Sequence, residues 1–437
     1  MGVKSSPWVG WAMRIIEMMG GAGGLALWVL TYPLLALLIR LNSKNSFVLA
    51  IPTHDMRQFF LRLIHGNGQL GMRGQHRHDA VHADSDRQPG EPVNFPGKIV
   101  EPTPAKVRNF LTIDVECWFH AYNIGDKIPR STWHLQETQI LKNMDRLLLL
   151  LQAHNTKATF FVLGWVADHF PEVVRMIDAE GHEIATHGYH HELVTRMTPQ
   201  EFEADLLQSL EAINRHTSQE VLGHRASNFT VVKDTLWALE ILAKNGIRYD
   251  SSIFPIGRKR YGIEGYSQRH PHTLRMPDGR PLIELPMSTT RLLGSNKLLP
   301  VAGGGYFRLY PYHLTAAFIE NENRNGLPAM VYLHPWELDS EQSRYYLGAS
   351  KTFQHYVNLE STEWKLDRLL ERFSFGSVKE GLPGVRNLIR DNVVPLSQLY
   401  ESPEVAQSNA DYLRKMSGKG SSTKSVLEEA ELRSLVG

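Results

Sequence analysis

Apolar and polar positions divide the chain into segments of two kinds between residue 108 and about residue 339. Short runs rich in β-branched and aromatic residues are typical of buried strands, and longer stretches with apolar residues three or four positions apart are typical of helices. The strand-like runs cover residues 110–116, 157–163, 183–186, 247–250, 282–286 and 329–334. The helix-like stretches cover residues 171–180, 199–213, 233–245 and 311–325. Their alternation predicts an α/β domain with a parallel sheet.

The helix expected after residue 198 has the best-defined start. Thr198 is a residue type that caps helix N-termini, Pro199 suits the first helical position, and Glu201 completes a capping box. The apolar residues that follow recur at helical spacing, and they are Phe202, Leu206, Leu210 and Ile213. We therefore expect a helix that packs one face on the sheet.

Polar residues follow several of the strand-like runs, at the point where each run ends. Asp114 and Glu116 are two positions apart, so a strand places both carboxylates on one face. His187 and His191 are four positions apart, a spacing that lets two neutral imidazoles bind one divalent metal if the backbone coils after the strand. Because the carboxyl ends of parallel strands open at one mouth of a barrel, we expect these side chains to meet. Two further residues in such positions are Arg225 and His334.

This set contains the parts of a metal-assisted hydrolase. One carboxylate and two histidines suit a metal, a second carboxylate suits a base, an arginine can orient that base, and a further histidine suits an acid. Each part also has a structural alternative: a solvated strand end for the carboxylates, satisfied histidines for the pair, a surface ion pair for Arg225 and a core position for His334. His190 is interpreted as structural rather than as a third histidine ligand.

Composition narrows the classes of function. The 437 residues carry a formal net charge of +1, and 42% of them are hydrophobic. Such a chain can bury a sizeable core, and its balanced charge gives no electrostatic argument for a nucleic-acid partner. The single cysteine, Cys117, excludes an internal disulfide framework and a cysteine-based zinc finger.

The first 107 residues have a different character from the rest. Residues 18–39 contain no charged side chain and are long enough to cross a bilayer, so membrane association is our first interpretation of segment 1–65. A signal peptide or a buried amphipathic element is the alternative. Residues 66–107 are polar, and they predict a disordered linker. The expected location is the membrane or the cell envelope, with the periplasmic side among the options and the cytoplasm as the alternative.

Several of these motifs resemble those of the polysaccharide deacetylase family, carbohydrate esterase family 4. They occur in that family's order, and they are Thr112-Ile-Asp114-Val-Glu116, His187-Gly-Tyr-His-His191, Arg225-Ala-Ser-Asn-Phe229, Asp250 and Leu333-His334. Three features resemble in particular the deacetylases of bacterial exopolysaccharide and exosortase loci. These are the Asp-Val-Glu form of the first motif, the segment 303–308 and the extension that includes residues 353–360.

The resemblance implies a fold and a reaction. The fold is α/β, a distorted (β/α) barrel of the polysaccharide deacetylase type with fewer than eight complete units, expected over residues 108–340. A helical C-terminal extension over residues 341–385 would pack on the barrel, and residues 386–437 would form a flexible tail. The implied reaction is hydrolysis of N-acetyl groups on an acetylated polysaccharide, with the exopolysaccharide synthesis machinery as a candidate partner.

The resemblance also implies roles for the residues at the mouth. A divalent metal, with Zn²⁺ as the first choice, would be held by Glu116, His187 and His191. Asp114 would act as the general base, and Arg225 would orient it by an ion pair. The division of labour between Asp114 and Glu116 rests on motif order alone, because the family's usual form has two adjacent aspartates.

The remaining roles concern the leaving group and the sugar. His334 would protonate the departing amine, and Asp250 would hold His334 in its protonated form. The backbone N–H near Phe229 would support the oxyanion. Tyr306 and Trp336 are the aromatic residues chosen for stacking on a sugar.

Two positions depart from the family's pattern. Ser227 stands where the family commonly has proline, and Cys117 stands where its closest relatives usually carry an acid. These departures keep open a catalytically inactive carbohydrate-binding component of an export system. A second alternative is an amidohydrolase of the same fold that acts on a small cyclic amide or ureide.

Overall fold

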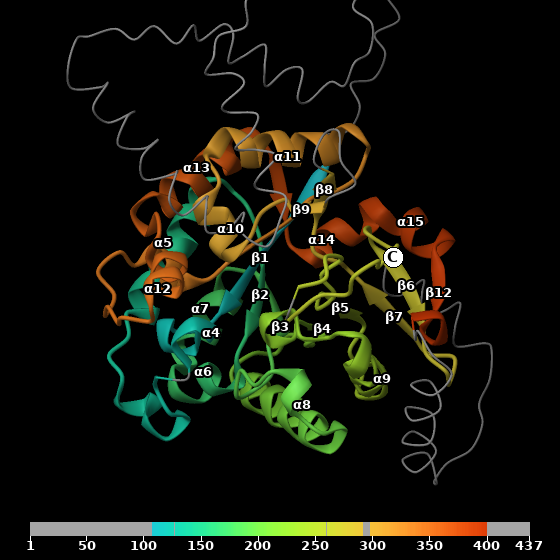
Figure 1. Ribbon diagram of the computed structural model, residues 1–437, viewed down its shortest axis with the longest axis horizontal. Coiled ribbons are helices and arrows are strands. Elements are labelled where there is room, and N and C mark those ends of the chain that lie inside the picture. Colours follow the sequence, from blue (N-terminus) through green and yellow to red (C-terminus); the bar gives the residue numbers. More distant parts are fainter. Residues whose placement is uncertain (1–106, 126, 259, 292–297, 400–437) are drawn as a thin grey trace, which may run out of the picture. The chain divides into compact units, whose positions relative to one another are not determined.

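A mainly parallel sheet forms the centre of the fold (Figure 1). The computed structural model describes residues 107–399, apart from residues 126, 259 and 292–297. Its strands follow the order β10-β1-β2-β3-β4-β5-β7-β6-β12, and β11 pairs with the start of β1. In this sheet, β6 and β7 pair antiparallel and the other pairs are parallel. The predicted membrane segment, residues 18–39, and the predicted linker up to residue 106 lie outside the described residues.

The strands are short, and most of their residues are buried. The sheet contains β1 (Arg108–Val115), β2 (Thr159–Val162), β3 (Glu183–Thr186), β4 (Gly223–His224), β5 (Tyr249–Asp250), β6 (His272–Arg275), β7 (Pro281–Glu284), β10 (Met330–Leu333), β11 (Ser374–Gly376) and β12 (Val393–Pro395). A separate hairpin joins β8 (Thr289–Arg291) to β9 (Leu298–Pro300). The parallel α/β architecture expected from the alternating segments is confirmed.

The sheet curls until its two sides come together. Inward side chains from β1, β2, β3, β5, β7 and β10 share one apolar cluster, which includes Phe110, Phe161, Ile283 and Met330. The hydroxyl of Ser288, just beyond β7, accepts a hydrogen bond from the backbone N–H of Met330 at 2.7 Å. The strand order has two ends, and the shared cluster and this hydrogen bond link the region after β7 to β10, as in an incomplete barrel.

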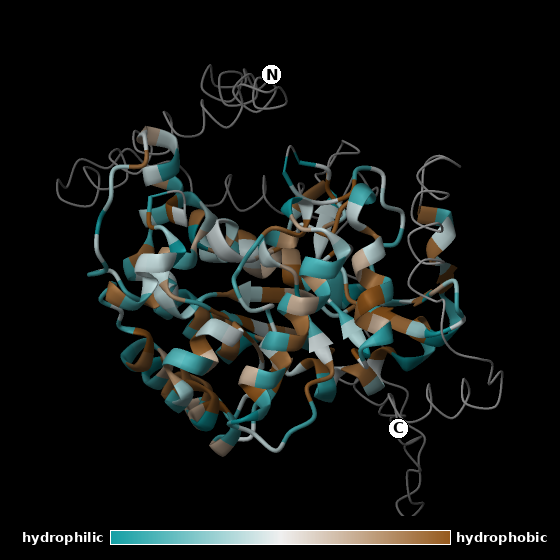
Figure 2. Cartoon of the chain, turned by 90° about the horizontal axis from the view of Figure 1, so that it is seen from below, coloured by the Kyte–Doolittle hydropathy of each residue, from teal (hydrophilic) through white to brown (hydrophobic). Residues whose placement is uncertain are grey.

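Helices surround the sheet, and most of them lie on its outer face. They are α4 (Tyr122–Gly125), α5 (Ile140–Ala153), α6 (Gly164–His169), α7 (Pro171–Ala179), α8 (Pro199–Asn214), α9 (Trp237–Lys244), α10 (Gly304–Leu309), α11 (Tyr312–Arg324), α12 (Ala349–Tyr356), α13 (Thr362–Arg372), α14 (Val378–Gly381) and α15 (Arg386–Asp391). Single helices carry both hydrophobic and hydrophilic residues (Figure 2), as expected where one face packs on a core. None of the helices in this part of the chain is both long and apolar enough to cross a membrane.

The start of α8 matches the sequence prediction in detail. The Thr198 hydroxyl accepts a hydrogen bond from the N–H of Glu201 at 3.3 Å, and the Glu201 carboxylate accepts one from the N–H of Thr198 at 2.7 Å. Phe202 and Leu206 then bury on the sheet side of the helix. Local sequence signals therefore determine where this helix begins.

The C-terminal extension is part of the sheet and does more than pack against it. β11 lies beside β1, β12 lies beside β6, and residues of α14 and α15 close one end of the inner apolar cluster. Ordered elements continue to Leu399, where the sequence predicts a flexible tail from residue 386. Strands too short to show two-residue alternation explain why the sequence did not reveal β11 and β12.

Candidate active site

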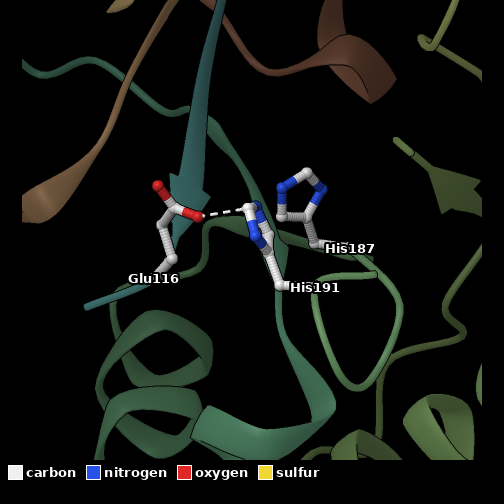
Figure 3. A group of neighbouring side chains, drawn as sticks. All are labelled: Glu116, His187 and His191. Carbon is white, nitrogen blue, oxygen red and sulfur yellow. Dashed lines mark ion pairs between the residues drawn. The ribbon is translucent and has the colours of Figure 1, made fainter. Parts of the chain in front are cut away.

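Three potential metal ligands meet at the carboxyl ends of β1 and β3. Ligand atoms of Glu116, His187 and His191 all lie within 4.8 Å of one another (Figure 3). His187 Nδ1 donates to the carbonyl oxygen of Arg225 at 2.7 Å, which leaves its Nε2 free to bind a metal. His191 has a φ of 53°, a conformation that β-carbon-bearing residues adopt rarely and that is typical of functional sites. The structure thus brings the three predicted ligands together.

The surroundings of Glu116 fit a cation. Its Oε2 is buried without a hydrogen bond from any described residue, although His191 Nε2 lies 2.8 Å away. Two electron-donating atoms that face each other in this way suit a shared positive ion. Burial opposes ionisation of Glu116, but the neighbouring histidines His191, His334 and His187 outweigh it and hold its pKa below the usual range. A carboxylate is therefore ready to bind a metal.

Asp114 lies beside the metal-ligand cluster and forms a buried ion pair with Arg225. Arg225 Nη1 donates to Asp114 Oδ1 at 2.7 Å, and the arginine has no exposed surface. Its other donors bond to Thr112 and Ser251, and its guanidinium lies 4.2 Å from the ring centre of Phe161. An arginine with so many contacts holds the carboxylate in one orientation. The predicted pairing of Asp114 with Arg225 is present in the structure.

His334 stands at the end of β10, opposite these carboxylates. Its Nε2 lies 3.5 Å from Glu116 Oε1 and 3.9 Å from Asp114 Oδ2. Its Nδ1 donates to Glu337 Oε2 at 2.9 Å, and its backbone N–H donates to the same oxygen at 2.9 Å. Burial alone would lower its pKa, but the carboxylates Glu116, Glu337 and Asp114 outweigh burial and raise the pKa of His334 to about 9. His334 is thus protonated at neutral pH, as a general acid must be.

Asp250 does not have the predicted contact with His334. Its Oδ1 accepts hydrogen bonds from His224 Nδ1 and from the Ser252 hydroxyl, both at 2.7 Å. Four strands lie between β5 and β10 in the sheet order, which explains why the two residues do not meet. The carboxylate that contacts His334 belongs to Glu337.

Glu337 is in turn held by Arg308 of α10, which the C-terminal extension fixes in place. Its Oε1 accepts a hydrogen bond from Arg308 Nε at 2.5 Å, and neither residue is appreciably exposed. Arg308 also donates to the backbone carbonyls of Gln354, His355 and Val357. Burial opposes ionisation, yet Arg308 and His334 lower the pKa of Glu337 to about 2. Sequence analysis missed both Glu337 and Arg308, although the spacing of His334 and Glu337 is that of a capping box.

The aromatic residues chosen for sugar binding have other surroundings. Trp336 is buried and donates from Nε1 to Glu116 Oε1 at 3.0 Å, and its ring stacks on His334 and His355. Phe229 packs in the inner core beside Arg225, and its N–H donates to the carbonyl of Ala226 at 3.1 Å. That N–H is therefore already used and is not free for an oxyanion. Both Trp336 and Phe229 pack among buried residues that are distant in the sequence, and the sequence alone does not reveal such neighbours.

Tyr306 lies on the first turns of α10. Its hydroxyl is 3.4 Å from the hydroxyl of Tyr261, and its side chain is partly exposed. The glycines before it serve close packing: a β-carbon on Gly303 would lie 1.8 Å from the ring of Tyr332, and one on Gly304 would lie 3.5 Å from His334. This close packing places α10 against the site.

The two departures from the family's pattern leave the cluster intact. Cys117 is buried, its N–H donates to His120 Nδ1, and burial raises the pKa of its thiol to about 12. A thiol that stays protonated competes poorly for a metal. Ser227 begins the turn that carries Phe229, and Arg225 keeps its contacts. His190 bonds to Asp205 outside the cluster, as a structural histidine does.

Comparisons with known proteins agree with this geometry. Residues 136–249 match the polysaccharide deacetylase family. Residues 251–382 match a domain of unknown function (DUF3473). The two matches meet near residue 250, so the polysaccharide deacetylase segment supplies His187, His191 and Arg225, and the second segment supplies His334, Glu337 and Arg308. Asp114 and Glu116 precede both matched segments.

Several relatives with similar sequences are named deacetylases. A peptidoglycan deacetylase of Helicobacter pylori is 36% identical over 108 residues, which are 25% of this chain and 36% of the relative. A peptidoglycan-N-acetylglucosamine deacetylase of Bacillus cereus is 39% identical over 70 residues, 16% of this chain and 26% of the relative. A chitooligosaccharide deacetylase of a Bradyrhizobium species is 32% identical over 97 residues, 22% of this chain and 42% of the relative. The chain thus spans less than half the length of each.

Proposed function

We propose that the protein is a metal-dependent N-deacetylase that removes acetyl groups from N-acetylhexosamine units of a polysaccharide. The observation that carries this proposal is the convergence of one carboxylate–histidine ligand cluster, one arginine-held carboxylate and one histidine beside these carboxylates at a single end of the sheet. The names of the relatives support the same substrate class. An acetylated exopolysaccharide is our proposed polymer.

The ligand cluster supplies the first part of the chemistry. Glu116, His187 and His191 would hold a divalent metal, and Zn²⁺ suits one carboxylate with two imidazoles. Such an ion, when bound, polarises the acetyl carbonyl and lowers the pKa of water. Trp336 and the Arg225 carbonyl fix two of the three ligands through hydrogen bonds, so the cluster keeps its geometry.

The remaining residues move protons. Asp114 takes a proton from the attacking water, and its ion pair with Arg225 keeps the accepting oxygen in place. His334 gives a proton to the amide nitrogen as the carbon–nitrogen bond breaks, which releases acetate and a free amine. Glu337 holds the acid through Nδ1, so that the Nε2 proton faces the reacting atoms.

Acetate release and metal content together test this function. The purified protein should lose activity on chelation and regain it with Zn²⁺, and it should release acetate from N-acetylglucosamine oligomers. His191→Ala should lose both metal and activity, whereas the matched change His190→Ala, outside the cluster, should retain the metal. Sugar binding without acetate release at any metal would instead support the carbohydrate-binding component, and release from small cyclic amides alone would support the amidohydrolase.

Two further expectations belong with this function. Association with a membrane would depend on residues 18–39, and a polymer in the cell envelope would be the corresponding substrate. Fractionation of cells that carry the full chain or a chain lacking residues 18–39 tests both. Recovery of the shortened and the full chain in the same fraction would contradict the membrane role.

A further inference from the structure

Two tyrosines of the C-terminal extension stand exposed on a firmly held loop. Tyr346 is 79% exposed and Tyr345 is 37% exposed, and both precede α12. Burial of an aromatic ring stabilises a fold, so two neighbouring aromatic rings that are exposed to solvent are unusual unless the surface also binds something. Their exposure requires another explanation.

The loop that carries them is anchored at several points. The backbone N–H of Tyr345 donates to the Tyr356 hydroxyl at 2.8 Å, and the N–H of Leu347 donates to the Thr352 hydroxyl at 2.9 Å. Gln342 is buried, and its amide donates to the carbonyls of Trp336 and Asp339. The tyrosines are thus presented by a loop of fixed shape.

Two separate routes connect this loop to the metal-ligand cluster. Tyr345 stacks on Trp118 with ring centres 5.4 Å apart and planes at 22°, and Trp118 follows Glu116 by two residues. Gln342 bonds to Trp336, whose indole N–H donates to Glu116. Because two extended residues span about 7 Å, the Tyr345 ring lies only a few sugar units from the cluster.

The far side of the same region is also formed by the extension. The Nζ of Lys351, on α12, lies 5.9 Å from the ring centre of Tyr122. Tyr122 is the first residue of α4 and comes four residues after Trp118. The extension therefore meets the segment after Glu116 at Trp118 and at Tyr122, in continuity with the site. A polymer chain that enters the site has to continue somewhere, and an adjoining aromatic rim is a surface that pyranose rings favour.

We propose that Tyr345 and Tyr346 form a distal subsite that binds a pyranose ring of the same polymer chain, away from the unit being deacetylated. The outer ring faces stack on the sugar, and the phenol hydroxyls bond to its hydroxyl groups. This inference rests on the proposed function, and it assigns to the domain of unknown function a part in choosing substrates by length.

Kinetics with N-acetylglucosamine oligomers of increasing length test the subsite. Wild-type KM should fall as the oligomer becomes long enough to reach the rim. The double variant Tyr345→Ala/Tyr346→Ala should raise KM for the hexamer about two- to tenfold, the effect of one or two aromatic stacking contacts. Its kcat and its KM for the dimer should stay unchanged, because neither ring touches the reacting atoms.

Matched variants separate the subsite from structural effects. Tyr346→Ala alone removes a ring that is 79% exposed, so it should raise KM for the hexamer with little effect on thermal unfolding. Trp364→Ala removes another exposed ring, 53% exposed on α13, and should leave KM unchanged for both the dimer and the hexamer. Equal kinetics of the double variant and the wild type on the hexamer, or equal losses on dimer and hexamer, would overturn the inference.

A wrong proposed function would give a different result from a wrong subsite. In that case the wild type would release no acetate from any oligomer. Calorimetric titration of the Zn²⁺-loaded protein with the hexamer would still test the subsite, because tighter binding of the hexamer than of the dimer should vanish in the double variant. Length-independent binding by the wild type would overturn the subsite alone.

Discussion

Glu337→Gln is expected to move the basic limb of the pH–rate profile. Glu337 is fully buried and accepts two hydrogen bonds from His334, each at 2.9 Å. Burial would lower the pKa of His334, but Glu337 is among the carboxylates that raise it to about 9. A general acid works only while it is protonated, so wild-type kcat/KM should hold up to about pH 9 and fall above it.

The size of the shift follows from the charge that is removed. One opposite charge at hydrogen-bond distance changes a pKa by about one to three units, equivalent to roughly 1.4–4 kcal/mol at 1.36 kcal/mol per unit. The limb should therefore move toward lower pH by that amount. Near pH 8 the variant should be about two- to ninetyfold slower than the wild type for a shift of one to three units, and below about pH 5 the two should converge, because His334 is then mostly protonated in both.

The assay is kcat/KM for acetate release across the pH range, with metal content measured on the same samples. The variant also leaves Arg308 without its buried carboxylate, which costs about 3–5 kcal/mol of stability, so thermal unfolding must show a folded protein at each pH. Glu371→Gln is the matched control, since Glu371 pairs with Arg368 at 2.8 Å on an exposed face of α13. An unchanged basic limb in folded, metal-loaded Glu337→Gln would refute the reasoning.

Three further variants probe other parts of the structure. Asp114→Asn should lower kcat about 10²–10⁴-fold while metal content stays near wild type, because Asp114 is outside the ligand cluster; metal loss would contradict this division of roles. Thr198→Ala should lower the free energy of unfolding by about 1 kcal/mol in urea without changing kcat, and an unchanged urea midpoint would speak against the capping box. Gly303→Ala should lower the melting temperature, because its β-carbon would meet Tyr332 at 1.8 Å; Gly305→Ala, with open space around it, should not.

The residues at the mouth of the site could be predicted from sequence because they lie at the ends of strands. Asp114, Glu116, His187 and His334 each follow a buried run, and parallel strands bring their carboxyl ends to one edge. That argument needs only the order of the elements. It does not need the distance between any two side chains.

The partners of the cluster could not be predicted in the same way. Arg308 reaches Glu337 from another helix, and Trp336 turns its indole toward Glu116 because the extension packs behind it. Asp250 was chosen by motif order, and the strand order places it beside His224 instead. Which buried polar groups pair is decided by packing across the whole sheet, and a linear pattern carries no record of it.

The pairing of β1 has a consequence for biosynthesis. β1 begins at Arg108, yet two of its three neighbours, β10 and β11, lie near the other end of the described chain. During synthesis, the backbone groups of β1 that pair with β10 and β11 stay unpaired until residue 376 has left the ribosome. Holding chaperones are therefore expected to meet this nascent chain, and a prematurely terminated product should be cleared by proteolysis.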